Sequence, residues 1–146
     1  AYSMSVRENI AANLITTLKA IASPRIKKVT REPFEFDKLS NAQFPAILVR
    51  TSNETREDAS IGGSLSFRES SVEYELVCFV KHRNIDTARN QLIEAIDEKL
   101  DADRTRGGHA IDTQVTSIEV DDGTIDPVGG IIMTVRIMYQ YTRGDA

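Results

Sequence analysis

The sequence has few of the residues on which several common folds and sites depend. It contains one cysteine, Cys78, and no tryptophan in 146 residues. A single thiol cannot form an intramolecular disulfide, and it cannot supply a zinc site built from cysteines. The apolar runs are only a few residues long, so no segment is expected to span a membrane. The first ten residues, AYSMSVRENI, lack the apolar region of a secretory signal, and none is expected.

An excess of positive charge is also missing. Eighteen Lys and Arg residues stand against 22 Asp and Glu residues, which gives a formal net charge of −4. Proteins that coat nucleic acid are usually net basic, so this class is not expected. The hydrophobic fraction of 40% and the charged fraction of 27% are ordinary for a globular protein. Length and composition therefore predict one domain over residues 1–146, without indicating a function.

Two segments have the residue spacing of amphipathic helices. From Ser5 to Ala22, apolar residues recur every three or four positions, and Ser5 with Glu8 fits a capping box. Asp86 can cap a second helix that runs to about Leu100. The expected buried positions of the second helix are Leu92, Ile93, Ile96 and Leu100. The Gly107–Gly108 pair then provides a helix exit and a turn.

The other apolar segments have the patterns of strands. Between residues 72 and 80 the apolar side chains alternate, which places Val72, Tyr74, Leu76, Cys78 and Val80 on one face. Val77 and Phe79 make the second half apolar on both faces, which predicts a central strand. Further strands are expected near residues 25–31, 46–50, 114–120 and 131–142. This order predicts an α+β fold, with two helices packed on one face of a mostly antiparallel, mixed β-sheet.

Two polar segments stand out from this pattern. Residues 51–66, TSNETREDASIGGSLS, are the most polar stretch and predict a long flexible loop or a hairpin arm. Residues 25–31, RIKKVTR, form the one basic cluster. Lysine and arginine often protect sheet edges, so a solvated or partner-facing edge strand is expected there, with phosphate binding as the alternative.

No set of residues in the sequence has the spacing of a catalytic, cofactor or metal site. The two histidines, His82 and His109, stand at the ends of predicted elements without an evident partner. Cys78 is expected to act as a small buried hydrophobe. Three nearby aspartates lack the spacing of a calcium loop: Asp121, Asp122 and Asp126. The glycine pairs match no phosphate-binding motif. We therefore expect a protein that is not an enzyme and holds no cofactor.

The order of the segments carries a resemblance to a known family. SVRENIAANLITTLKAI is followed by FPAILVRT, by SVEYELVCFVK, by DTARNQLIEAIDEKLDADRTRGG and by IMYQYTRGDA. From about Ser5 to Asp145 the chain resembles the tail terminator, or minor tail (tail-completion), proteins of long-tailed bacteriophages. The PAILVR strand, the EKLDADRTRGG helix exit and the closing YQYTRGD carry most of this resemblance.

The resemblance implies a structural role in the virion. Tail terminators form a hexameric ring at the head-proximal end of the tail tube, stop tube polymerisation and present a surface to the head connector. The implied partners are further copies of the chain, the tail tube protein and the head–tail connector, and DNA would pass through the lumen without specific binding. The implied location is the virion, with assembly in the host cytoplasm. A head–tail connector or tail-completion (neck) protein remains an alternative, as does a small α+β enzyme or ligand-binding domain.

Two groups of residues follow as candidates for such a role. If residues 51–66 form an arm against the tube or a neighbouring subunit, the interface candidates are Arg50, Glu54, Arg56, Glu57 and Arg68. An acidic lumen would repel DNA phosphates and let the strand slide. The candidates for this lining lie on the outer face of the second predicted helix and are Glu94, Asp97, Glu98 and Asp101.

Overall fold

The fold was analysed in a computed structural model, which describes residues 6–22, 25–32, 43–58, 67–81, 84–120 and 128–142. These residues form two helices and five strands. In chain order they are α1 (Val6–Lys19), β1 (Lys28–Thr30), β2 (Ala46–Asp58), β3 (Phe67–Lys81), α2 (Ile85–Ala102), β4 (Asp112–Val120) and β5 (Val128–Thr142).

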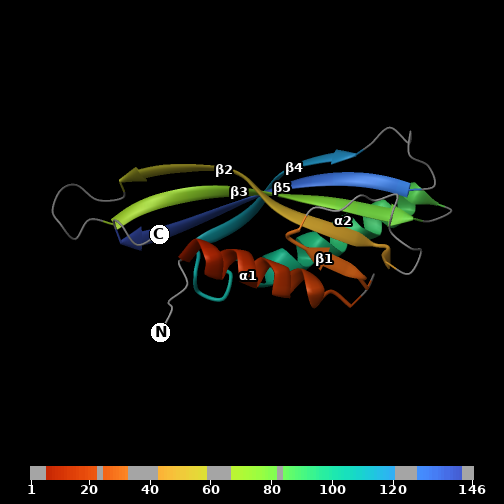
Figure 1. Cartoon of the computed structure of the whole chain (residues 1–146), viewed down its shortest axis with the longest axis horizontal. Coiled ribbons are helices and arrows are strands. Elements are labelled where there is room, and N and C mark those ends of the chain that lie inside the picture. The colour runs from red at the N-terminus through yellow and green to blue at the C-terminus, as the bar shows by residue number, and fades with distance from the viewer. Residues whose placement is uncertain are drawn as a thin grey trace.

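The five strands form one twisted sheet in the order β1-β2-β3-β5-β4. The short strand β1 pairs with β2 in parallel, and the other three pairings are antiparallel. Both helices lie on the same side of the sheet, with α1 and α2 below the strands in the view of Figure 1. The predicted α+β fold with a mixed, mostly antiparallel sheet is confirmed. The prediction that the segment containing Val77 and Phe79 is central is also confirmed, because β3 occupies the middle of the sheet.

The hydrophobic core lies between the helices and the sheet. The alternation predicted for β3 is confirmed, since the five residues assigned to one face are all buried: Val72, Tyr74, Leu76, Cys78 and Val80. The neighbouring strand β5 contributes alternate residues from Ile131 to Tyr139 in the same way. The helices bury one stripe each, comprising Ile10, Leu14 and Leu18 of α1 and Leu92, Ile96 and Leu100 of α2. Each such side chain stabilises the fold by about 1.5–3 kcal/mol.

The start of α2 differs from the expectation. The predicted cap Asp86 lies inside the first turn, and Asn84 is the N-cap. The Asn84 side chain accepts a hydrogen bond from the Thr87 amide at 3.3 Å, which satisfies one of the amides left free at a helix start. The helix here passes close to β5. A Cβ atom on Gly129 would lie 2.4 Å from Cγ2 of Ile85, so only glycine fits at this position.

The polar stretch 51–66 is also different from a simple flexible loop. Residues 51–58 continue β2 and pair with β3 as far as the Asp58–Arg68 partners. Over residues 51–58 the structure therefore has a strand of the predicted hairpin arm and not a loop. Residues 59–66 lie outside the described ranges. A register shift between Thr51 and Asn53 marks a β-bulge where this polar half of β2 begins. The proposed capping box at Ser5 likewise lies outside the described residues.

Candidate functional site

The arm is the part of the sheet that extends beyond the helices. It consists of the outer ends of three strands: residues 51–58 of β2, 67–71 of β3 and 138–142 of β5. In Figure 1 these ends project to the left past α1. All five predicted interface residues lie on or next to this arm. Arg50, Glu54, Arg56 and Glu57 are on β2, and Arg68 is on β3 opposite Asp58.

Glu54 connects two strands of the arm to each other and to α1. Its Oε1 atom accepts hydrogen bonds from Nε of Arg7 in α1 at 3.1 Å and from the Tyr139 hydroxyl of β5 at 2.9 Å. Its Oε2 atom accepts one from Nε of Arg56 at 2.7 Å. The Glu54 side chain is only 13% exposed. Both carboxylate oxygens therefore have partners within the chain, and the residue links α1, β2 and β5.

Charge and hydrogen bonding decide the protonation of Glu54. Burial alone would raise the pKa of this carboxyl, but the hydrogen bonds from Tyr139 and Arg56 and the charges of Arg7 and Arg56 hold the pKa below its ordinary value. Burial raises the pKa of the Tyr139 hydroxyl, so this group stays protonated and can donate its hydrogen bond. Arg50, by contrast, forms an ion pair with Glu75 at 3.0 Å on the exposed face of the sheet.

The predicted lumen residues lie along α2, away from the buried stripe. Glu94, Glu98 and Asp101 are exposed, and Asp97 is half-buried. Burial and the neighbouring charge of Asp101 raise the pKa of the Asp97 carboxyl. All four carboxylates thus lie outside the buried stripe of α2. Whether this surface faces a lumen stays a prediction.

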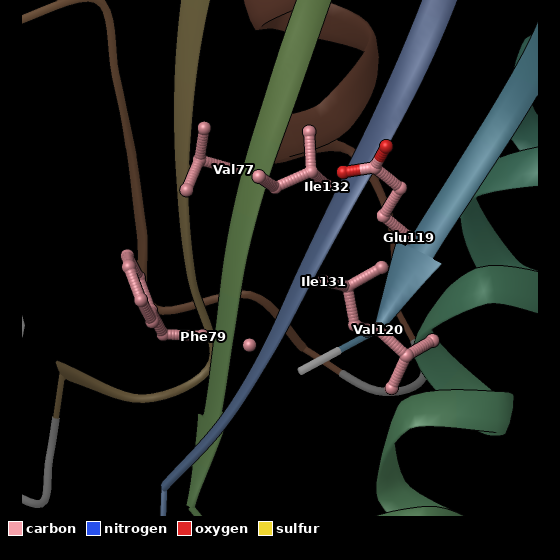
Figure 2. Close-up of a pocket in the computed structure, with 7 residues that line it drawn as sticks. Val77, Phe79, Glu119, Val120, Ile131 and Ile132 are labelled. Atoms are coloured by element: carbon pink, nitrogen blue, oxygen red, sulfur yellow. The ribbon is translucent and has the colours of Figure 1, made fainter. Parts of the chain in front are cut away.

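An apolar hollow lies on the sheet near the ends of β4 and β5. Its volume is about 310 Å³, and it is lined by Val77, Phe79, Glu119, Val120, Gly130, Ile131 and Ile132. Figure 2 shows Val77, Phe79 and Ile132 on the side of the sheet without helices, whereas Val120 and Ile131 point toward the helix side. The lining offers one charged group, Glu119, and no nucleophile. This hollow is suited to apolar contact rather than to chemistry.

A second hollow, of about 330 Å³, lies between the end of α1 and the outer side of α2. It is lined mainly by small residues, with Ile21, Glu98 and Lys99 among them. A third, of about 120 Å³, lies on the arm and includes Arg56, Glu69 and Arg136. Among the described residues, no group of three His, Cys, Asp or Glu side chains is placed to hold a metal ion. None of the described helices is long and apolar enough to cross a bilayer.

The potentially reactive residues are placed as follows. Cys78 is fully buried, and burial raises the pKa of its thiol to about 12, so it carries almost no thiolate at neutral pH. His109 is exposed in the turn after α2. His82 and the three aspartates Asp121, Asp122 and Asp126 lie outside the described residues, as does the Gly62–Gly63 pair.

Comparison with known proteins adds a likeness in fold. No protein-family model matches the chain, and no curated protein matches it. A solved structure does: a chain of the "Virion of native gene transfer agent (GTA) particle" has the same fold. The two superpose with a TM-score of 0.50 at 13% sequence identity, over 94% of this chain and 92% of the other. At this identity the likeness shows a shared fold that runs through nearly the whole of both chains.

Sequence patterns missed one residue that organises the helix layer. Arg106 is completely buried in the turn after α2 and has a positive φ of 50°. Its guanidinium donates to the carbonyl oxygen of Leu100 at 2.8 Å, to that of Asp103, and to Oγ1 of Thr17 in α1 at 3.3 Å. It therefore caps the carbonyl end of α2 and links the two helices. In the sequence, the run RTRGG indicated only the end of a helix and a turn.

Proposed function

We propose that this protein is a structural component of a tailed, phage-like virion. The observation that carries the proposal is the shared fold over 94% of the chain with a chain of a gene transfer agent virion. The distribution of the surfaces supports it. Two sheet edges, a projecting arm and an apolar hollow on the open face provide several separate places for protein contacts.

Within the virion, we propose the role of tail terminator. In this role, copies of the chain form a ring, expected to be hexameric, at the head-proximal end of the tail tube. The ring ends tube polymerisation and receives the head connector. The order of segments in the sequence supports this role. The arm, with Arg50, Arg56, Glu57 and Arg68, then supplies contacts to the tube protein or to a neighbouring subunit. Glu54 holds the arm in position.

DNA passes through such a ring without being bound. Acidic side chains suit this passage, because they repel phosphates. Glu94 and Glu98 are the members of the acidic set that lie farthest from the buried stripe of α2, and we propose them for the lumen lining. Asp97 and Asp101 lie closer to the β4 side of the helix.

Particles assembled without the protein test this function. If it is a tail terminator, electron microscopy of a knockout will show tubes of uncontrolled, excessive length. Tails of normal length that lack heads would instead assign the protein to the head–tail connector. Normal, complete particles, together with its absence from the protein content of purified wild-type particles, would exclude a virion role.

A further inference from the structure

The exposed apolar side chains gather at one edge of the sheet. Among the residues that the structure describes, the large hydrophobic side chains left exposed are Ile111 at 48%, Ile118 at 42% and Val120 at 47%. All three lie on β4 or directly before it, and β4 is an edge strand. Its sequence, DTQVTSIEV, contains no lysine, arginine or proline. Sheet edges are normally protected by such residues, so this edge is available for a partner.

The apolar side chains of this edge lie beside α2. Val120 points toward the helix side of the sheet in Figure 2, and Ile118 shares that face because it pairs directly with the buried Met133. The strand itself contacts α2, but the helix leaves both side chains partly uncovered. Glu119, between them, points to the opposite face and borders the apolar hollow.

The α2 flank above this edge is acidic. Successive residues of a helix are rotated by about 100°. Ala95, Glu98 and Lys99 line the hollow next to α1, so the opposite flank of α2 carries Asp86 and Asp97, with Asp101 adjoining them. We call the four carboxylates along this side of the molecule the acidic edge: Asp86, Asp97 and Asp101 of α2 and Glu119 of β4.

The opposite edge of the sheet carries the opposite charge. There β1 contacts α1, and the segment around it contains four cationic residues: Arg25, Lys27, Lys28 and Arg31. We call these four residues the basic edge. Arg25 and Lys27 are exposed, and Arg31 forms an ion pair with Glu8 of α1 at 2.7 Å. Because β1 and β4 are separated by three strands, the two charged edges cannot meet within one subunit.

We propose that a second copy of this chain docks its basic edge against the acidic edge and the exposed apolar residues of β4. A contact between two β4 edges would bring like charges together, which is unfavourable, whereas a head-to-tail contact pairs opposite charges. Head-to-tail contacts use two different patches, and they form a ring when the rotation between successive copies closes a circle. This inference deepens the proposed ring and rests on it for the closure of the contact into a circle.

A charge-swap experiment tests the pairing. One variant carries Asp97→Lys and Glu119→Lys in the acidic edge, and the other carries Arg25→Glu and Lys27→Glu in the basic edge. The matched control, Glu94→Lys with Glu98→Lys, changes the net charge of the protein by the same amount as the first variant does, but its substitutions lie on the outer face of α2. Sedimentation velocity at low and high salt measures self-association, and circular dichroism checks that each variant is folded.

The expected result has three parts. The wild type self-associates, and added salt weakens its association because part of the contact is electrostatic. Each swapped variant alone associates at least about tenfold more weakly, while the control associates like the wild type. An equimolar mixture of the two swapped variants recovers the association, because every reversed edge then meets its complement.

Several outcomes would overturn the inference. These are a wild type that stays monomeric at low salt, a folded pair of variants whose mixture does not recover association, and a control that loses association equally. Association like that of the wild type in all variants would also overturn it, because the contact between copies would then not use these edges. The virion role is judged separately, from the knockout particles. If the protein is present in particles but its two charged edges do not pair, only the assignment of the edges is refuted, and the virion role stands.

Discussion

Replacing Glu54 should destabilise the arm and its contact with α1. The carboxylate of Glu54 accepts hydrogen bonds from Arg7, Arg56 and Tyr139, which belong to three different elements. Glutamine at this position keeps an oxygen for the Tyr139 hydroxyl but removes the charge. Alanine removes all three interactions. The two substitutions therefore separate the contribution of the ion pairs from that of the buried hydrogen bond.

The magnitudes follow from the exposure of each partner. The side chains of Arg7 and Arg56 are 44% and 35% exposed, so solvent screens both ion pairs and each contributes about 0.2–1 kcal/mol. Glu54→Gln should thus lower the free energy of unfolding by about 1 kcal/mol. The buried hydrogen bond from Tyr139 to a charged acceptor adds about 1.5–3 kcal/mol, so Glu54→Ala should cost about 2–4 kcal/mol.

Urea denaturation at neutral pH measures these differences. The matched control is Glu75→Gln, which breaks the exposed ion pair with Arg50 and should cost less than about 0.5 kcal/mol. A double-mutant cycle of Glu54→Ala with Tyr139→Phe should give a coupling energy of about 1–2 kcal/mol. If Glu54→Ala costs no more than the control and the coupling energy is zero, the structural reasoning is refuted.

The pH dependence provides an independent check. The pKa of Glu54 is lower in the folded protein than the ordinary value of 4.5, so the ionised carboxylate stabilises the fold. This contribution is fully present above the ordinary pKa and is lost as the pH falls through the folded pKa. The stability difference between the wild type and Glu54→Gln should be constant from neutral pH down to about pH 5 and should shrink in more acidic solution. A difference that grows in acid would contradict the assignment.

Four further predictions concern the body of the molecule. Arg106→Met should lower the free energy of unfolding in urea by about 2–3 kcal/mol, because it removes the charged cap of α2. Gly129→Ala should cost about 1–3 kcal/mol in the same assay, because the new Cβ would clash with Ile85. Asp97→Asn should slightly raise thermal stability at neutral pH, since the folded protein disfavours the ionised form, and this gain should vanish in acid. Cys78 should react with a thiol reagent only on unfolding, as absorbance of the released chromophore would show.

The buried faces could be predicted from the sequence because they depend on local periodicity. The two-residue alternation from Val72 to Val80 and the helical spacing of Leu92, Ile96 and Leu100 correspond directly to the core side of each element. Periodicity is a property of a single segment, so it can be recognised without knowing which other segment packs against it. The central position of β3 was predictable for the same reason, since its second half is apolar on both faces.

Features that depend on contacts between distant segments could not be predicted in this way. Residues 51–58 are polar, and they form a strand because β3 pairs with them and Arg7 and Tyr139 bind Glu54. The burial of Arg106 depends on carbonyl groups that only the folded turn brings together. The helix begins before the predicted cap Asp86, because the Asn84 side chain accepts the hydrogen bond of the Thr87 amide once the turn has formed.

The arrangement of the two charged edges also depends on contacts between distant segments. The basic cluster at residues 25–31 was visible in the sequence, and an edge strand was expected there. Its position opposite the acidic edge follows from the strand order, in which β5 lies between β3 and β4. Nothing local in the sequence specifies that order. The exposure of Ile118 and Val120 likewise follows from how far α2 extends over the sheet.

The continuity of the long strands has a mechanical consequence. β3 and β5 have 15 residues each and pair without a register shift, so each runs about 50 Å from the arm to the helix-covered end. The two strands form a stiff beam without a hinge, and the register shifts lie in their neighbours, between Thr51 and Asn53 of β2 and between Val115 and Ser117 of β4. A force applied to the tip of the arm is therefore carried as shear across their hydrogen bonds to the sheet beneath the helices. A sheet built in this way bears load along the length of β3 and β5 rather than bending between the arm and the helix-covered end.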